Sequence, residues 1–215
     1  MRNELSSDPY REGRARHYKQ HHQKNLRTRL TSWREQEVVR LALEAAGRPE
    51  IVLDLPCGTG RYWPVFESNG CRKLIAADIS EAMLDVAAED KPNIADFSYR
   101  QLDLFDIDLP DNSVEFISCQ RFLHHVSIPE ERAQVLSELR RVASGHVAIS
   151  LWVDGNLQGR RYVNREIRPE PGYGRRICRR RNEVEREFLE AGFTIIDHYD
   201  VWPGIAMWRL YLLKV

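Results

Sequence analysis

The residues with the clearest chemical potential follow an apolar run, in Val52-Leu-Asp-Leu-Pro-Cys-Gly-Thr-Gly-Arg61. Two glycines separated by one residue permit a tight turn in which backbone amides approach a ligand closely. A helix that starts after such a turn adds partial positive charge from its N-terminus. The sequence therefore predicts a nucleotide-like ligand bound by Asp54, Leu55, Pro56, Cys57, Gly58, Thr59 and Gly60.

Two residues beside the turn narrow the identity of that ligand. A dinucleotide-binding turn needs a third glycine so that helix and strand pack closely beside the pyrophosphate. Here the third position is Trp63, whose indole would block the approach. Asp54, before the turn, suits the cationic amino group of a methionine moiety better than it suits phosphates. Together they favour S-adenosylmethionine over a nicotinamide or flavin dinucleotide.

Two further acids follow the next two apolar runs. Asp78 ends the run 73–78, where a carboxylate can accept both hydroxyls of a ribose. Asp103 follows the run 97–102 and is placed to accept from an adenine amino group, with the Leu104 amide nearby. Ile79, Met83 and Gln120 complete the predicted cofactor-binding residues.

The elements that must position these acids alternate along the chain. Expected strands cover 51–55, 73–78, 97–102, 114–119, 146–152, 193–201 and 207–213, and expected helices cover 63–68, 81–88, 129–142 and 183–190. Such alternation is typical of a parallel sheet with helices on both faces. We predict an α/β fold with a doubly wound, mostly parallel seven-stranded sheet and an antiparallel C-terminal strand.

The segments outside this alternation define the predicted domain organisation. Residues 1–33 read as an N-terminal arm or lid, with Thr31 or Ser32 as the cap of the helix before the sheet. Residues 34–215 form the cofactor-binding domain, which carries an arginine-rich insert at about 154–181. Although the net charge is zero, residues 50–120 hold 14 acidic and 5 basic residues, while residues 160–181 hold nine arginines.

Composition excludes several classes of protein. Hydrophobic residues make up 42% and charged residues 30% of the chain, and no apolar run approaches the ~20 residues of a membrane-spanning helix. The four cysteines are widely spread without a Cys-x-x-Cys pair, which argues against a disulfide framework and a zinc site. We expect reduced thiols, a cytoplasmic location and no metal.

On these motifs the chain resembles the class I S-adenosylmethionine-dependent methyltransferases from about residue 34 to the C-terminus. The glycine turn, Asp78 and Asp103 look like the family's three cofactor motifs, and Phe122-Leu-His-His-Val126 looks like its segment after strand four. Glu138-Leu-Arg-Arg-Val142 and Glu190-Ala-Gly-Phe193 also match. Pro56 departs from the pattern, because it replaces a glycine and removes one amide. The resemblance implies the Rossmann-like methyltransferase fold and S-adenosylmethionine-dependent methyl transfer.

The sequence signals for binding of the methyl acceptor are less specific than those for the cofactor. His124 and His125 are candidate general bases at the carboxyl edge of the sheet, with cofactor contact or packing as the alternative. Gln120 and Arg121 flank the same place. Trp33, with Tyr10 and Tyr18, is expected to close over the cofactor. His17 and His21 lie one helical turn apart, but the basic residues around them disfavour a metal.

The arginine-rich insert suggests an anionic ligand, since the planar guanidinium binds phosphate and carboxylate bidentately. Arg161, Arg165 and Arg121 are the candidate anion-binding residues. We expect a small-molecule, glycolipid-type or other envelope-related acceptor. The alternatives are a regulatory protein that binds an anion such as a phosphorylated compound or a cyclic dinucleotide, and a nucleic-acid methyltransferase. Nucleic acid is disfavoured because no Asn/Asp-Pro-Pro-Tyr-like motif is present. The sequence does not define the oligomeric state.

Overall fold

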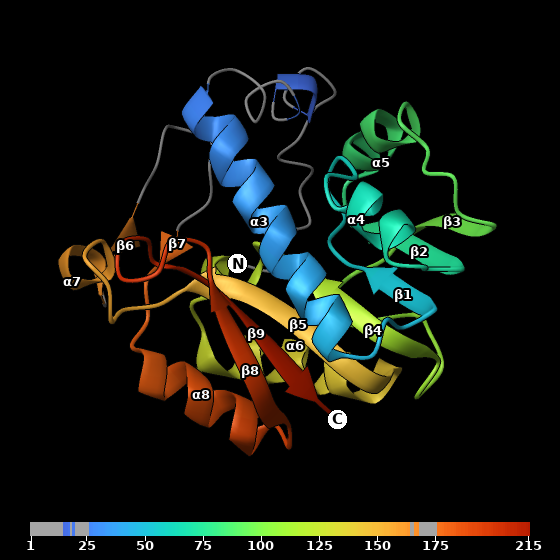
Figure 1. The fold of residues 1–215 in the computed structure, drawn as a ribbon. Helices are drawn as coiled ribbons and strands as arrows, with labels where there is room; N and C mark the ends of the chain where they lie inside the picture. Colours follow the sequence, from blue (N-terminus) through green and yellow to red (C-terminus); the bar gives the residue numbers. More distant parts are fainter. Residues whose placement is uncertain (1–14, 18, 20–25, 164–165, 168–175) are drawn as a thin grey trace.

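The computed structural model describes residues 15–17, 19, 26–163, 166–167 and 176–215. A seven-stranded sheet runs through the described part of the chain in the order β3-β2-β1-β4-β5-β9-β8, with helices on both faces (Figure 1). Its strands are β1 (Ile51–Asp54), β2 (Lys73–Asp78), β3 (Asp96–Gln101), β4 (Val114–Cys119), β5 (Ala143–Trp152), β8 (Thr194–Asp200) and β9 (Trp208–Lys214). The first five strands are parallel, and β9 is antiparallel to both β5 and β8. The predicted α/β fold is confirmed.

The helices and a small second sheet complete the fold. The helical segments are α3 (Leu26–Ala45), α4 (Trp63–Ser68), α5 (Glu81–Ala88), the short 3-10 helix η1 (Leu123–His125), α6 (Pro129–Val142), α7 (Gly159–Tyr162) and α8 (Arg181–Glu190). A two-stranded antiparallel sheet pairs β6 (Glu166–Ile167) with β7 (Arg176–Ile177). No described helix is both long and apolar enough to cross a membrane.

The sheet separates two hydrophobic cores. On one face Val39 of α3, Phe66 of α4 and Ala87 of α5 pack against the strands, where they belong to the same cluster as Phe116 of β4. On the other face α6 and α8 cover the sheet, with Leu139 and Phe188 fully buried. This double cover explains why β4 reads as an almost continuous apolar run, since both of its faces are buried.

Local signals placed most helices correctly. Ser80 caps α5 by accepting the Met83 amide, and α6 buries Val135, Leu136 and Leu139 as its periodicity predicted. The predicted cap at Thr31 or Ser32 is wrong, because α3 already begins at Leu26 and both residues lie inside it. Leucine and arginine favour helix, and no glycine or proline interrupts that stretch. The division predicted at residue 33 therefore falls within a helix.

Four elements were not expected from the sequence: η1, α7 and the β6–β7 pair. Each is four residues or shorter, which is too short to show helical or strand periodicity. The four cysteines are free and buried.

Candidate active site

The glycine turn joins the end of β1 to α4 at the carboxyl edge of the sheet. Gly58 has φ +54° and Gly60 has φ +77°, which are conformations that favour glycine. A Cβ on Gly60 would lie 2.6 Å from the indole of Trp63, so the ring fills the space where a dinucleotide-binding protein has its third glycine. A Cβ on Gly58 would meet nothing within 4 Å. The turn therefore offers open space above its backbone.

Hydrogen bonds hold this turn against both neighbouring strands. The Leu55 amide donates to the Ser118 carbonyl at 3.0 Å, and the Cys57 amide donates to the Ala77 carbonyl at 2.7 Å. Pro56, which has no N–H, lies between these two donors and follows a cis peptide bond. Cys57 and Thr59 are buried, so their side chains pack beneath the turn.

Asp54 is fully buried where β1 ends. Its Oδ2 accepts the indole N–H of Trp63 at 3.2 Å, while Oδ1 has no hydrogen-bond partner among the described residues. Burial raises the pKa of Asp54 to about 8. A buried carboxylate oxygen without a partner is costly, and a cationic group at this position would offset that cost.

Asp78 ends β2, next to the glycine turn. It accepts the amide of Gly58 at 2.9 Å and the amide of Ser80 at 3.0 Å, so it connects the turn to the first turn of α5. Its carboxylate is thus held in one orientation at the carboxyl end of β2, where the sequence predicts the ribose hydroxyls. Ile79 follows half-buried, and Met83 is buried on α5.

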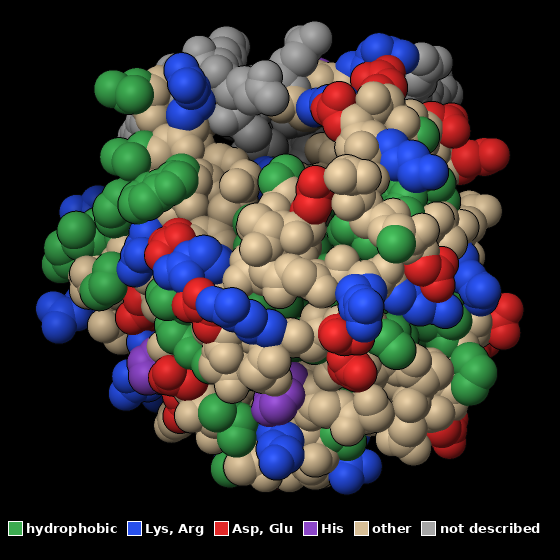
Figure 2. All heavy atoms as spheres, turned by 45° about the vertical axis from the view of Figure 1, so that its right-hand side comes forward, with side chains coloured by type: hydrophobic (Ala, Val, Ile, Leu, Met, Phe, Trp, Pro, Cys, Tyr) green, Lys and Arg blue, Asp and Glu red, His purple; other side chains and the backbone are tan. Residues whose placement is uncertain are grey.

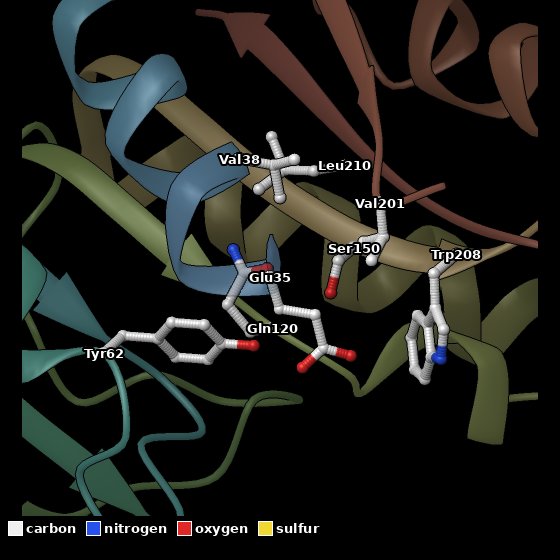
Figure 3. A pocket seen from close by; sticks show the side chains of 8 residues that line it. All are labelled: Glu35, Val38, Tyr62, Gln120, Ser150, Val201, Trp208 and Leu210. Atoms are coloured by element: carbon white, nitrogen blue, oxygen red, sulfur yellow. The ribbon is translucent and has the colours of Figure 1, made fainter. Parts of the chain in front are cut away.

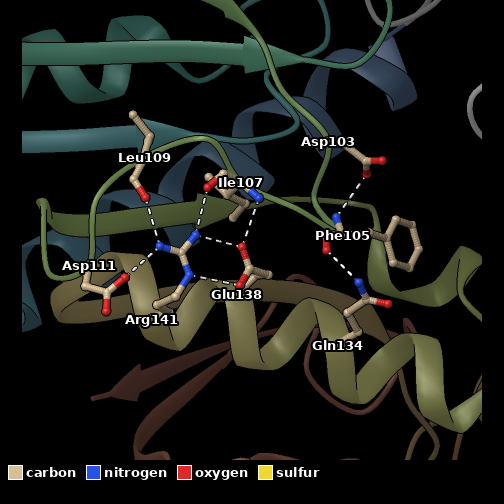
Figure 4. A network of polar contacts seen from close by, with 8 residues as sticks. All are labelled: Asp103, Phe105, Ile107, Leu109, Asp111, Gln134, Glu138 and Arg141. Atoms are coloured by element: carbon tan, nitrogen blue, oxygen red, sulfur yellow. Dashed lines mark hydrogen bonds and ion pairs between the residues drawn. The ribbon is translucent and has the colours of Figure 1, made fainter.

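Asp103 follows β3 on a loop that α6 holds in place (Figure 4). The Asp103 carboxylate accepts the Phe105 amide at 2.9 Å, and Gln134 donates to the Phe105 carbonyl at 2.7 Å. Further along the loop, Arg141 donates to the carbonyls of Ile107 and Leu109, and Glu138 accepts the Ile107 amide at 2.9 Å. Leu104 is buried. Since β3, β2 and β1 are neighbours, the three predicted acids lie at one edge of the sheet.

Gln120 and the histidine pair follow β4. The buried Gln120 donates to the Ala148 carbonyl at 3.1 Å. His124 is 2% exposed, and its ring stacks on Trp152 with centroids 5.0 Å apart and meets the edge of Trp208. Burial holds the pKa of His124 well below its usual value. It is therefore neutral near pH 7, inside an aromatic cluster, while His125 is partly exposed beside it.

Arg121 belongs to a charged cluster that the sequence did not reveal. The carboxylate of Glu35, on α3, pairs with the guanidinium of Arg121 at 3.1 Å and also with that of Arg61. Arg121 lies over the ring of Trp208, with its Cζ 4.7 Å from the centroid, and Arg61 lies over the ring of Tyr62 at the same distance. Two guanidinium groups thus converge on one buried carboxylate.

A small pocket with room for about one water molecule lies beside this cluster, with the Glu35 carboxylate directed toward it (Figure 3). Its lining residues are Glu35, Val38, Tyr62, Gln120, Ser150, Val201, Trp208 and Leu210. Arg61 directly follows the glycine turn, which is the one signal that could have identified it. Glu35 is 86 residues from Arg121 and carries no such signal.

The remaining predicted residues lie away from this edge or outside the described part. Arg161 is exposed at the end of α7. Arg165, Tyr10, Tyr18 and His21 lie outside the described residues. Trp33 is 57% exposed on α3, and its closing over the cofactor stays a prediction. Among the described residues no group of three or more His, Cys, Asp or Glu side chains could hold a metal ion.

Comparisons with known proteins agree with this geometry. Residues 53–149 match the family described as a methyltransferase domain. An uncharacterised methyltransferase-like protein of Schizosaccharomyces pombe is 29% identical over 90 residues, which are 42% of this chain and 34% of that relative. The chain therefore matches about a third of the length of that relative.

Two solved structures cover most of the chain. A S-adenosylmethionine-dependent methyltransferase from Aquifex aeolicus is 27% identical, with a TM-score of 0.58 over 80% of this chain and 87% of that one. The magnesium protoporphyrin IX methyltransferase of Synechocystis PCC 6803, solved with S-adenosylhomocysteine, is 19% identical, with a TM-score of 0.66 over 88% of this chain and 87% of that one. Residues 53–149 are therefore a methyltransferase domain, and the chain has the fold of the class I S-adenosylmethionine-dependent methyltransferases, whose cofactor is S-adenosylmethionine.

The residues at the sheet edge fit that cofactor. The unpaired oxygen of Asp54 suits the cationic amino group, and the open space over Gly58 leaves room for the ligand. Asp78 would hold the ribose and Asp103 the adenine, as the sequence predicted.

Proposed function

We propose that this protein transfers a methyl group from S-adenosylmethionine to an anionic acceptor, either a small molecule or an envelope-related compound such as a glycolipid. The observation that carries the proposal is the convergence of Arg61 and Arg121 on Glu35, next to Gln120 and to the ring of Trp208. Guanidinium groups oriented by a buried carboxylate are suited to bind a carboxylate or phosphate of the acceptor. The aromatic rings beside them suit its apolar part.

When bound, S-adenosylmethionine supplies a methyl group on a sulfonium, which already activates it for displacement. The protein therefore has mainly to orient the acceptor and keep water away. Asp54 binds the cationic amino group of the cofactor, and Asp78 binds its ribose hydroxyls. Trp152, Trp208 and the neutral ring of His124 form an aromatic cluster on the acceptor side.

The test is the release of S-adenosylhomocysteine in the presence of panels of carboxylated, phosphorylated and neutral acceptors. We expect turnover with an anionic panel and none with its neutral counterparts. Arg121→Gln should lower the turnover, because it removes one guanidinium from the cluster, whereas the exposed control Arg72→Gln should not. Equal turnover with neutral acceptors, or an equal effect of both variants, would contradict the proposal.

A second candidate function is the regulatory binding of a phosphorylated anion such as a cyclic dinucleotide by Arg161 and Arg165. It is favoured by the exposure of Arg160 and Arg161, which form no ion pair within the described part of the chain. Titration with a cyclic dinucleotide should show binding that Arg161→Ala weakens. Unchanged binding in that variant would remove this candidate.

We also propose a cytoplasmic location. The four free cysteines support it, since thiols stay reduced in that compartment. Cell fractionation, with detection in the soluble or membrane-bound cytoplasmic fraction, tests it.

A further inference from the structure

Three segments on one side of the molecule expose large hydrophobic side chains. They are the first two turns of α3, the stretch 157–162 that includes α7, and the turn between β8 and β9. Within the described residues, six of the nine exposed large hydrophobic side chains lie on these segments. We call this area the apolar–basic surface; it comprises Leu26, Leu30, Trp33, Leu157, Tyr162 and Ile205, together with Arg29, Arg160 and Arg161.

Hydrogen bonds join the three segments in series. Arg34 of α3 donates to the Val201 carbonyl at 3.0 Å, just before the β8–β9 turn. Leu157 and Gln158 donate through their amides to the carbonyls of Gly204 and Ile205, at 3.0 and 3.1 Å. In Figure 1, α7 lies at the left and α3 runs from the upper left toward the centre; in Figure 2, which is turned by 45°, hydrophobic atoms run down the left-hand side. The segments therefore form one continuous area.

The charge of this surface is of one sign. The stretches 26–33 and 156–163 each contain two arginines, and neither these stretches nor 202–206 contain aspartate or glutamate. Arg29, Arg160 and Arg161 are exposed, and none of them forms an ion pair with another described residue. Single exposed hydrophobic residues are ordinary, but a grouped set within a basic field indicates a binding surface.

The surface adjoins the acceptor side of the site. The β8–β9 turn leads directly into Trp208, which carries Arg121 over its ring. The stretch 157–162 follows Trp152 at the end of β5, and Trp152 contacts the ring of Trp208. A partner bound at the surface would therefore lie beside the acceptor pocket.

We propose that the apolar–basic surface docks on an anionic lipid bilayer, so that an amphiphilic acceptor reaches the site from the membrane. Exposed leucine and tryptophan side chains enter the interfacial region of a bilayer, and arginines pair with anionic head groups. This combination of side chains fits a lipid surface better than a nucleic acid, whose backbone attracts arginine but not leucine. The inference extends the proposed function. Only the statement that the acceptor is amphiphilic rests on that function, whereas the docking itself is inferred from the surface.

The test measures cosedimentation of the full chain with vesicles, without cofactor or acceptor. We expect binding to vesicles of phosphatidylcholine with 30% phosphatidylglycerol, weak binding to pure phosphatidylcholine, and loss of binding as salt rises. Because each arginine near an anionic surface strengthens binding about fivefold, replacing Arg29, Arg160 and Arg161 by glutamine should weaken it roughly 100-fold.

The apolar part has its own variant and a matched control. Trp33→Ser combined with Leu157→Ser and Ile205→Ser should abolish binding to the anionic vesicles. The control combines Leu189→Ser with Arg186→Gln on α8; Leu189 is 59% exposed, close to the 57% of Trp33. It should bind like the unaltered protein. Unchanged thermal unfolding and affinity for S-adenosylhomocysteine show that each variant is folded.

Several results would overturn the proposal. One is the absence of binding to the anionic vesicles, and another is equal binding to both kinds of vesicle. A third is a loss of vesicle binding in the α8 control as large as that in the serine variant of the surface. A dimer that the serine variants dissociate would assign the surface to a second copy of this chain instead. RNA binding that depends on the arginines but not on Trp33 would assign it to nucleic acid. The vesicle assay involves no methyl transfer. Vesicle binding without turnover would therefore contradict the proposed activity and leave the proposed membrane docking intact.

Discussion

Asp54 links the chemistry of the cofactor to pH. In the protein without ligand its pKa is about 8, because burial penalises the charged form. A cation placed against the unpaired Oδ1 favours the ionised form, so binding should release a proton below pH 8. We expect the affinity for S-adenosylhomocysteine to rise by up to about tenfold per pH unit from pH 6 to pH 8. Calorimetry in buffers of different ionisation enthalpy measures the released proton.

Asp54→Asn provides the control, since it keeps the shape of the side chain and removes the titration. Its affinity should be lower and independent of pH over the same range. Calorimetric heats that do not depend on the buffer in the unaltered protein would show that Asp54 does not meet the cationic group.

His124 gives a prediction about the pH dependence of the stability of the fold. Its pKa is held well below 6.5 by burial, so below that pH the unfolded chain binds a proton that the folded protein does not. The free energy of unfolding should therefore fall as the pH falls through 6.5. His124→Phe keeps a ring against Trp152, and its unfolding temperature should change less between pH 7.0 and pH 5.5.

His198→Gln, an exposed histidine on β8, serves as the matched control and should behave like the unaltered protein. The same His124→Phe variant also addresses catalysis. A general base contributes about 10²–10⁴-fold, so turnover within tenfold of the unaltered protein would assign His124 to packing. An unaltered pH dependence of unfolding would contradict the packing role.

Among the elements, α6 positions the loop that follows β3. Arg141 bonds to the carbonyls of Ile107 and Leu109 and pairs with Glu138 and Asp111 (Figure 4). We expect Arg141→Met to lower the free energy of unfolding by about 2 kcal/mol, since it removes several hydrogen bonds from partly exposed groups. It should also weaken S-adenosylhomocysteine binding, because the loop carries Asp103.

The control for α6 is Arg186→Met, an exposed arginine on α8 whose ion pair with Glu190 is of the weak surface kind. Chemical unfolding and calorimetry separate the two effects of Arg141→Met. If ligand affinity stayed constant while stability fell, α6 would support the sheet without positioning Asp103.

The elements also show what the sequence can and cannot reveal. α5 and α6 were predicted with their observed bounds because their caps and apolar stripes are local features. The start of α3 was missed, because Thr31 and Ser32 are good caps but lie mid-helix when favourable residues precede them. The proximity of Asp54, Asp78 and Asp103 could be predicted, because each follows or ends one of three strands that are neighbours in the sheet. The pairing of Glu35 with Arg121 depends on how α3 docks on the sheet, which no local pattern encodes.

The described part of the chain is built on a seven-stranded sheet between two cores, and the predicted ligand site lies at the ends of three neighbouring strands of that sheet. Binding across β1, β2 and β3 should therefore stabilise the fold as a unit. At a hundredfold excess over its Kd, S-adenosylhomocysteine adds about 2.7 kcal/mol to the free energy of unfolding. For a chain of this size that corresponds to a rise in Tm of about 5–11 °C. Thermal unfolding with and without the ligand measures it.

Asp78→Asn tests whether that stabilisation comes from the sheet edge. Asp78 connects the glycine turn to α5, so the variant should lower the Tm of the free protein and also lose most of the rise caused by the ligand. Asp96→Asn, an exposed acid at the opposite end of β3, should keep the full rise. Because each variant is compared with its own ligand-free state, a loss of intrinsic stability does not affect the comparison. An Asp78→Asn protein with the full rise would place the ligand away from the carboxyl edge of β2.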